Sequence, residues 1–380
     1  MQAFGSDSQP LGSSVTSVTD PLGSSISFAA PLSHERQGDG WNTWSNGYTG
    51  DVYATGGAQS ATITLPAGTD AFYFYAEPDP YATYDFTATA QDGTSSGSLP
   101  IYGEAGAAYL GFYTTGATPL ISITVSSSID FAIGEFGIAL IPSATSNNWA
   151  GYVSQYPPNQ PVSASLTVPT VTCNVAGRIA MWVGYDGWES NSNTVEQDGI
   201  SAVCPRAGAR ASFVAWYELF KCTLRISANH CLNLNPFSNV SEIDVNPGAS
   251  ITPGDKVSLF VDRISPGRFG RIPLGRDQIL FSIYVNSSSG RTLGHWSQSI
   301  TEPVAFSPKY DSSECITERN VPRPLPKFTP IGFASCSVIT DAASPSDLLR
   351  IDLIGTAGKI ATAGYFNSND DFSVTWLGSS

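Results

Sequence analysis

The sequence is poor in basic residues. Of its 380 residues only 18 are Lys or Arg, against 32 Asp or Glu, so the formal net charge is −14 and the pI is near 4.5. Nucleic acid is excluded as a partner, because its phosphates require a basic surface. A surface with so few Lys and Arg stays close to neutral in acid, and this favours a protein of an acidic environment.

Long apolar runs and metal-binding patterns are also lacking. No stretch is apolar over the roughly eighteen residues that a membrane span needs, and residues 1–30 lack the basic and apolar regions of a signal peptide. Only three histidines occur, His34, His230 and His295, and no two cysteines form C-x-x-C. We therefore expect no membrane span, no metal site and no cofactor.

Helical periodicity is absent from the sequence as well. Charged residues make up only 13% of the chain, and the apolar runs are short, rich in Val, Ile, Phe and Tyr, and separated by Gly and Pro. This composition predicts an all-β protein. A chain of 380 residues is long enough for two domains that each bury a core.

All six cysteines lie in the second half of the chain. An even number of cysteines in a Lys-poor chain rich in Ser and Thr predicts three disulfides and an oxidising compartment, so we expect a secreted, extracellular monomer. Six cysteines allow many connectivities. Among them we favour one local loop closure and two longer bridges, which are Cys222–Cys231, Cys173–Cys204 and Cys315–Cys336.

The order of patterns along the chain predicts three segments. Residues 1–38 are rich in Ser, Gly, Thr and Pro and have few large apolar side chains, which predicts a flexible lead-in. Residues 39–142 show short alternating runs at the spacing of an antiparallel β-sandwich. The expected strands cover residues 61–65, 71–76, 84–90, 107–113, 120–125 and 131–140. A junction of small residues then marks the boundary to a larger domain over residues 143–380.

Aromatic residues cluster in the first part of the N-terminal sandwich. They could form a platform that stacks on sugars and binds glycans, or they could pack in the core and at its rim. The residues concerned are Trp41, Trp44, Tyr48, Tyr53, Tyr73 and Tyr75. Both interpretations are open, and packing is the more common role of such side chains.

The centre of the C-terminal domain is the stretch from Met181 to Gly199, M-W-V-G-Y-D-G-W-E-S-N-S-N-T-V-E-Q-D-G. Near its end lies Gln197, a polar side chain on a predicted strand. A buried amide without a partner costs about 1 to 3 kcal/mol, so we expect a partner for Gln197. The best candidate is Glu318, which shares one face of a predicted strand with Glu314. The alternative is that both residues lie on a solvated sheet face.

Six short motifs occur in order after residue 145. They are Ser-Asn-Asn-Trp149-Ala-Gly, Trp182-Val-Gly-Tyr-Asp186-Gly, Gln197-Asp-Gly, Trp216-Tyr-Glu218, Pro253-Gly-Asp255 and Glu314-x-Ile-x-Glu318. In this order and with these gaps they resemble the signature of the glutamic peptidases, also called eqolisins. The resemblance covers about residue 145 to the C-terminus and does not extend to the N-terminal domain.

The resemblance implies a sandwich of two curved antiparallel sheets and an acid-active endopeptidase with a catalytic Gln and Glu dyad. By motif position the dyad falls on Gln197 and Glu318, with Glu314 as a neighbour of the catalytic Glu. The residues that match substrate-binding or dyad-supporting positions are Trp149, Trp182, Asp186, Trp216 and Glu218. Polypeptides are then the substrates, no cofactor is required, and the N-terminal β-sandwich is an accessory domain.

The chain departs from the family's pattern at three places. Cys315 stands where the family has Trp in its E-W-I-V-E motif, Leu219 stands where Trp usually follows the Tyr-Glu pair, and Asp198 replaces a Thr. These changes concern the shape of the subsites and the local pKa values rather than the dyad itself.

The implied mechanism uses Glu318 to take a proton from water and return it to the leaving amine, while Gln197 stabilises the oxyanion. A base that works in acid must start ionised, so we expect Glu318 to keep a pKa close to the usual value of about 4.3. Two alternatives stay open, namely a glycosidase that uses Glu218 and Glu318 as paired carboxyls, and a glycan-binding or adhesive protein of two sandwiches. Serine and aspartic peptidase sites lack their motifs.

Overall fold

The computed structural model describes the chain apart from residues 115–118, 156–160, 189–193, 222–223, 228–229, 233–239, 266–267, 270–271, 274, 303–307, 321–322, 343–346 and 368, and apart from the side chains of residues 222–241 and 266–274. The chain is all-β, as the sequence predicts, and each part is a sandwich of antiparallel sheets. It forms two compact units, Met1–Ile141 and Pro142–Ser380. This division lies one residue before the one expected from the sequence.

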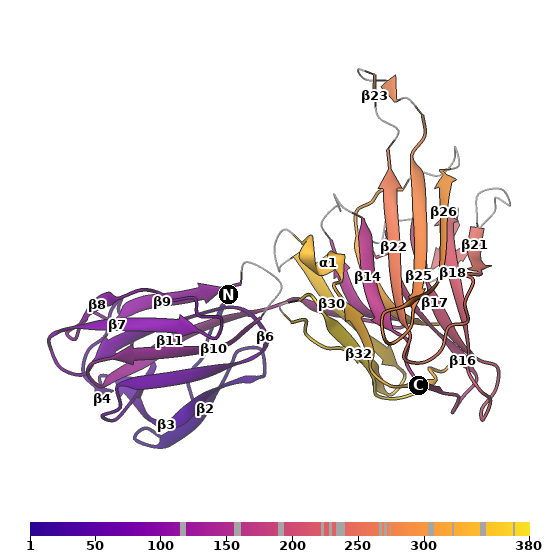
Figure 1. Cartoon of the computed structure of the whole chain (residues 1–380). Helices are drawn as coiled ribbons and strands as arrows, with labels where there is room; N and C mark the ends of the chain where they lie inside the picture. The colour runs from indigo at the N-terminus through magenta and orange to yellow at the C-terminus, as the bar shows by residue number, and fades with distance from the viewer. Residues whose placement is uncertain are drawn as a thin grey trace. The chain divides into compact units, whose positions relative to one another are not determined.

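The N-terminal unit is built from strands β1 to β11 (Figure 1). Its sheet has the strand order β1-β11-β5-β3-β6-β10-β7-β8, with β2 and β4 paired to β3 and β9 paired to β6. The strands are β1 Gln2–Ala3, β2 Ser14–Thr19, β3 Ser25–Gln37, β4 Gly40–Trp41, β5 Asp51–Ala54, β6 Ser60–Pro78, β7 Thr83–Ala90, β8 Leu99–Tyr102, β9 Ala108–Tyr113, β10 Leu120–Ser127 and β11 Phe131–Leu140. The long strand β6 contains two of the expected strands, 61–65 and 71–76.

The expected flexible lead-in at residues 1–38 is wrong. Val15 and Val18 on β2 and Ile26, Phe28 and Leu32 on β3 are all buried in the core of the N-terminal unit. The residues between them within each strand are Ser, Thr, Ala and Pro, and these are exposed or partly exposed. Val15 and Val18 are three positions apart, and a register shift between Val15 and Ser17 in the pairing with β3 allows both to face the core. A few large residues therefore suffice to form strands here, because those present bury one face.

The aromatic residues of the N-terminal unit divide between its interior and its surface. Trp41, Trp44 and Tyr53 are buried, with exposed fractions of 8%, 5% and 2%, so a glycan platform that includes them is wrong. Tyr73 and Tyr75 instead lie on the outward face of β6, where alternate residues are partly exposed.

The C-terminal unit has one continuous path of hydrogen-bonded strands in the order β21-β18-β17-β16-β27-β13-β30-β31-β32-β29-β14-β22-β25-β26, with β12 paired to β30. The strands are β12 Ser143–Ser146, β13 Trp149–Ser154, β14 Val162–Thr167, β16 Gly177–Tyr185, β17 Thr194–Cys204, β18 Ser212–Lys221, β21 Val240–Val245, β22 Lys256–Ile264, β25 Gln278–Asn286, β26 Thr292–Thr301, β27 Ser313–Arg319, β29 Ile331–Ala334, β30 Leu348–Gly355, β31 Gly358–Ala363 and β32 Phe372–Trp376. The path curves back on itself, so that its two ends form facing layers (Figure 1).

Contacts between the layers show which side chains face the core. The Tyr185 hydroxyl on β16 donates to the Val261 carbonyl on β22 at 3.1 Å, and an Asp198 oxygen on β17 accepts from the Ser282 N–H on β25 at 3.0 Å. Because side chains alternate along a strand, Trp182 and Gln197 face the opposite side of the sheet. That side carries the candidate site.

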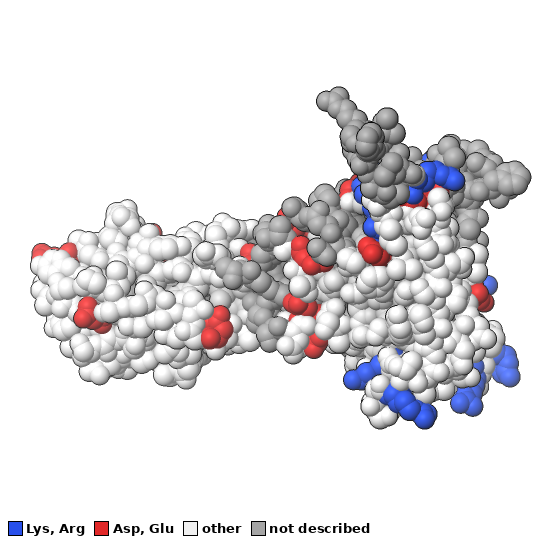
Figure 2. Space-filling model, turned by 45° about the horizontal axis from the view of Figure 1, so that its top comes forward, with Lys and Arg blue, Asp and Glu red and all other residues white. Residues whose placement is uncertain are grey.

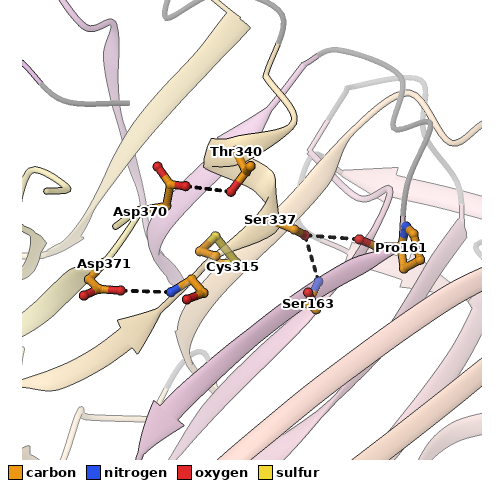
Figure 3. The surroundings of a disulfide bond; sticks show 9 residues. Pro161, Ser163, Cys315, Ser337, Thr340, Asp370 and Asp371 are labelled. Carbon is orange, nitrogen blue, oxygen red and sulfur yellow. Dashed lines mark hydrogen bonds between the residues drawn. A yellow bond between two sulfur atoms is a disulfide. The ribbon is translucent and has the colours of Figure 1, made fainter. Parts of the chain in front are cut away.

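The residues that the structure describes contain two disulfides, Cys173–Cys204 and Cys315–Cys336. Both pairings match those favoured from the sequence, and the Cys222–Cys231 pairing lies outside the described residues. The second disulfide joins β27 to the residue before α1, Ser337–Thr340 (Figure 3). The Ser337 hydroxyl accepts from the Ser163 N–H at 2.9 Å and donates to the Pro161 carbonyl at 3.2 Å. Strand β27 is thus tied covalently to a hydrogen-bonded corner of the unit.

Candidate active site

The register of four neighbouring strands, β18, β17, β16 and β27, brings the site together. Gln197 on β17 is directly paired with Glu218 on β18 and, on its other side, with Gly184 on β16. Glu318 on β27 is paired with Ala180 of β16. Since residues 180 and 184 are an even number of positions apart, the paired side chains lie on one face of the sheet.

Tryptophans fill the same face beneath and beside these polar groups. Trp182 and Trp216 are fully buried, and Trp149 packs edge-to-face on Trp182 with ring centroids 5.1 Å apart. Gly199 permits this packing, because a Cβ at that position would lie 2.7 Å from Trp182 Cβ and 3.0 Å from Trp216 Cζ2. The rigid aromatic layer fixes the strands that carry the amide and the carboxyls.

A cavity of about 530 Å³ opens over this face. Its walls contain both predicted dyad residues and Glu218, together with several polar and charged residues. The lining residues are Asn148, Arg178, Ala180, Gln197, Glu218, Glu242, Glu318, Arg319 and Asn320. The volume is within the range usual for small-molecule and peptide side-chain pockets.

The Gln197 amide is held by Glu218. Its Nε2 donates to Glu218 Oε2 at 2.6 Å, whereas its Oε1 is buried and accepts no hydrogen bond from the described residues. The expectation that Glu318 is the direct partner of Gln197 is therefore wrong. The reason is the register, since Glu218 lies opposite Gln197 on the adjacent strand, and Glu318 reaches the cavity from β27, beyond β16.

The Glu318 carboxyl accepts one hydrogen bond on each oxygen. Asn148 Nδ2 donates to Oε1 at 3.1 Å, and Trp182 Nε1 donates to Oε2 at 2.9 Å. Burial nevertheless raises the pKa of Glu318 to about 7, against the lowering effect of the two donors, and the negative charge of Glu218 adds to the rise. The expected pKa near 4.3 is thus wrong, because desolvation of the carboxylate outweighs its hydrogen bonds.

Glu218 is in a similar electrostatic position. Burial raises the pKa of Glu218 to about 7, while the hydrogen bond from Gln197 and the charge of Arg178 lower it. Arg178 forms an ion pair with Glu242 at the cavity wall. Three carboxyl groups with raised pKa values, those of Glu218, Glu242 and Glu318, thus share one cavity, and burial favours their protonated forms in acid.

The other residues expected at the site have different positions. Asp186 is fully buried, and its carboxylate accepts from the Lys309, Tyr310 and Asp311 N–H groups at 3.0 to 3.1 Å, so it anchors the turn before β27 rather than lining the cavity. Trp216 Nε1 donates to the Ser201 hydroxyl at 2.8 Å. Glu314 is fully buried, and burial raises its pKa well above the usual value.

Several cavity residues were not identified from the sequence. Asn148 is part of the Ser-Asn-Asn-Trp motif, so its position beside Trp149 was the available signal. Arg178, Glu242 and Arg319 carry no motif, and only the register of their strands brings them to the cavity. Long charged side chains on strands are common on solvated surfaces, and their sequence pattern gives no sign of this site.

The positions that depart from the family's pattern are buried as well. Cys315 is paired with Cys336 and is not exposed at all. Asp198, next to Gln197, faces the core between the layers, and burial raises its pKa well above the usual value. Neither residue lines the cavity.

Within the described residues, no helix has the length and apolar character that a membrane crossing requires.

The cavity thus brings the carboxyls of Glu218 and Glu318 together with the amide of Gln197. Carboxyl groups can transfer protons and an amide can donate to an oxyanion, as a hydrolase requires. The sequence matches the model of the Peptidase A4 family over residues 147–376. The chain therefore belongs to the peptidase A4 family, and it is a glutamic endopeptidase.

The chain also shows a distant similarity to several solved structures. The chain is 19% identical to scytalido-glutamic peptidase, solved with a transition state analog inhibitor, over 61% of this chain and 98% of that one, with a TM-score of 0.43. It is 18% identical to SCP-B, an eqolisin solved with the tripeptide Ala-Ile-His, over 61% and 98%, with a TM-score of 0.41. It is 19% identical to aspergilloglutamic peptidase from Aspergillus niger, over 53% and 99%, with a TM-score of 0.35. None of the curated proteins compared with the sequence matches it.

Proposed function

We propose that the chain is a secreted, acid-active endopeptidase in which Gln197 and Glu318 form the catalytic dyad. The observation that carries the proposal is that both side chains lie on the wall of one cavity, each fixed by a neighbour. Glu218 orients the Gln197 amide, and Asn148 and Trp182 orient the Glu318 carboxyl. The two disulfides support an oxidising compartment.

In the proposed reaction, ionised Glu318 takes a proton from a water molecule as the water oxygen attacks the peptide carbonyl carbon. The Gln197 N–H that is not bonded to Glu218 donates to the developing oxyanion, an interaction worth about 3 to 4 kcal/mol at comparable sites. Protonated Glu318 then gives its proton to the leaving amide nitrogen, the C–N bond breaks, and the carboxyl product forms.

The raised pKa values set the protonation state in which this reaction works. With Glu218 and Glu318 both protonated there is no base, and with both ionised the charge of Glu218 repels the oxyanion next to Gln197. The active form carries one negative charge on the pair. Because both pKa values are raised to about 7, this singly ionised form is most populated near pH 7, so we expect a bell-shaped profile with its maximum near neutrality and an acidic limb that extends into weak acid.

The proposal is tested by Glu318→Gln, which keeps the shape of the side chain and removes the base. Cleavage of an unfolded protein substrate should fall by at least about a thousandfold, as expected when a general base is lost with its transition-state charge. Asp244→Asn is the matched control, because Asp244 is an exposed carboxylate on β21 that does not line the cavity. Near-parental cleavage by Glu318→Gln would show that another group is the base.

The two alternatives raised by the sequence fare differently. A glycosidase that uses Glu218 and Glu318 as paired carboxyls is not favoured, since the family match covers both residues and is to peptidases. A glycan-binding role concerns only the N-terminal unit and is compatible with peptidase activity in the other unit. We propose the N-terminal unit as an accessory domain.

A further inference from the structure

A group of tyrosines lies on the outward face of the N-terminal unit. Tyr73 and Tyr75 are on β6, and Tyr109 is on β9, where it is paired with Tyr75. The ring centroids of Tyr73 and Tyr109 are 5.5 Å apart, and those of Tyr75 and Tyr109 are 5.6 Å apart. Tyr109 is 54% exposed, a large fraction for an aromatic side chain packed against two others. We call these three residues the tyrosine platform.

Two rings of the platform lie flat on the sheet over glycines. A Cβ at Gly137 would lie 2.2 Å from Tyr73 Cε1, and a Cβ at Gly111 would lie 2.3 Å from the Tyr109 hydroxyl oxygen. Each ring thus covers a glycine with one face and turns its other face outward. The planes of Tyr73 and Tyr109 differ by 33°, whereas Tyr75 stands at 83° and 78° to them. Tyr73 and Tyr109 therefore form the outward aromatic surface, and the Tyr75 ring stands nearly perpendicular to both of them.

A carboxylate lies beside the platform in a strained backbone conformation. Glu135 is at the bulge of β11, between the residues paired with Tyr75 and Tyr73, and has φ of 52°, which is rare for a residue other than glycine. Its Oε2 accepts from Trp44 Nε1 at 3.1 Å, and its Oε1 has no hydrogen bond to the described residues. The register places Glu135 between the two tyrosines along β11, and after burial its charge is the next cause of the raised pKa of Tyr73 and of Tyr75.

The charge of the N-terminal unit restricts what can bind there. Residues 1–141 contain 13 Asp and Glu and one basic residue, Arg36, a formal net charge of −12. Arg36 is ion-paired with Asp51, and the face of this unit in Figure 2 shows acidic residues and no Lys or Arg. A polyanion would be repelled from such a surface. Binding therefore has to come from stacking and neutral hydrogen bonds.

We propose that the tyrosine platform binds an uncharged polysaccharide. The C–H groups on one face of a pyranose ring carry a small positive charge and pack on the negative face of an aromatic ring. Tyr73 and Tyr109 supply such faces side by side, Tyr75 bounds them, and Glu135 Oε1 accepts a sugar hydroxyl. Exposed aromatic patches of this kind mark interaction sites, and rings already held flat lose little conformational entropy on binding.

The proposal is tested by co-sedimentation of the full-length protein with insoluble cellulose, β-1,3-glucan and chitin, and by its retardation in gels that contain soluble neutral glucan. The protein should bind at least one of these polymers, with little change between low and high salt. Tyr109→Ala and Tyr73→Ala should each weaken binding by tenfold or more, whereas Tyr109→Phe should bind like the parent because it keeps the ring.

Tyr81→Ala is the matched control, because Tyr81 is also 54% exposed and makes no ring contact with the platform. It should bind like the parent. Absence of binding to all the neutral polymers, equal binding by Tyr109→Ala, or binding only to dextran sulfate that falls with salt would overturn the proposal. Thermal unfolding of each variant separates loss of the platform from loss of the fold.

Discussion

At the scale of single residues, the chemistry of the site depends on how burial and hydrogen bonding compete at Glu318. Burial favours the protonated carboxyl, and the donors Asn148 Nδ2 and Trp182 Nε1 favour the carboxylate. Glu218 adds a second carboxyl whose charge disfavours ionisation of Glu318. Because both pKa values are raised to about 7, small changes at these neighbours move the pH dependence of catalysis.

Trp182→Phe should shift the acidic limb of the activity profile upward. The change removes the donor to Glu318 Oε2 but keeps an aromatic ring in the packed layer. A hydrogen bond to a charged group is worth about 1.5 to 3 kcal/mol, so the pKa of Glu318 should rise by about one to two pH units. The pH dependence of kcat/KM measures this. Trp216→Phe is the control, because its donor bonds to Ser201, and an equal shift in both variants would contradict the account.

Glu218→Gln should change the alkaline limb of the pH profile of kcat/KM. The amide can still accept the hydrogen bond from Gln197 Nε2, but it cannot ionise. If the alkaline limb reports the second ionisation of the carboxyl pair, activity should rise once with pH as Glu318 ionises and then stay level above neutrality, without an alkaline fall. The pH profile of kcat/KM decides this, and a bell of unchanged width would show that Glu218 is not the group behind the alkaline limb.

The motifs allowed the dyad residues to be predicted but not their surroundings. Gln197 and Glu318 belong to recognisable sequence motifs, and both line the cavity. The direct partner of Gln197 was misjudged because a sequence does not give the register between β17 and β18. The raised pKa of Glu318 was missed for a related reason, since desolvation depends on the tryptophans that pack around the carboxyl rather than on its neighbours in sequence.

At the scale of elements, strand β27 is the most constrained part of the site. It pairs with β13 and β16, carries Glu314 and Glu318, and is joined through Cys315 to Cys336. Around this disulfide, Thr340 Oγ1 donates to Asp370 Oδ2 at 2.7 Å and the Ser335 N–H donates to Asp371 Oδ1 at 2.9 Å (Figure 3). The catalytic strand is thus held by pairing on both sides and by a covalent bond.

Reduction should destabilise the C-terminal unit selectively. Each disulfide can contribute about 2 to 4 kcal/mol by restricting the unfolded chain, and residues 1–141 contain no cysteine. In calorimetry, a reducing agent should lower the unfolding temperature of the C-terminal unit and leave that of the N-terminal unit in place. Equal shifts in both transitions, or none, would contradict this assignment.

Strand predictions succeeded where apolar and polar residues alternate clearly. The expected strand at 131–140 coincides with β11. The segment before residue 38 was misread because its composition of Ser, Thr and Gly is also typical of disordered chains. The deciding feature was the position of Val15, Val18 and Ile26 on one face, which only pairing with neighbouring strands makes stable.

At the scale of the whole molecule, the negative charge is divided unequally between the units. The N-terminal unit has a formal net charge of −12 of the total −14. In the C-terminal unit the notable feature is burial of carboxyls instead, since Glu196, Asp198 and Glu314 are fully buried and their pKa values are raised well above the usual range. Such groups remain protonated in acid and oppose ionisation near neutrality.

The C-terminal unit should therefore be more stable in acid than near neutrality. A carboxyl whose pKa is raised on folding stabilises the folded state below its unfolded pKa, and that stability is lost as the pH rises through the folded pKa. For Glu318, from 4.5 to about 7, the difference is about 3 kcal/mol, and the buried carboxyls act in the same direction. Urea unfolding at pH 4 and pH 8 should show the larger free energy at pH 4. Higher stability at pH 8 would contradict the burial of ionisable carboxyls, and Glu196→Gln should reduce the difference.

The most direct test of the central claim is the pH profile of kcat/KM for Gln197→Glu on a peptide substrate. The change replaces the proposed oxyanion donor by a group that repels negative charge when ionised, and it adds a carboxyl to the three already in the cavity, those of Glu218, Glu242 and Glu318. Activity should fall by at least about a hundredfold, and the remaining activity should move to lower pH, where the new carboxyl is protonated and can still donate. A parental rate with an unshifted profile would contradict the assignment of Gln197 and Glu318 as the dyad.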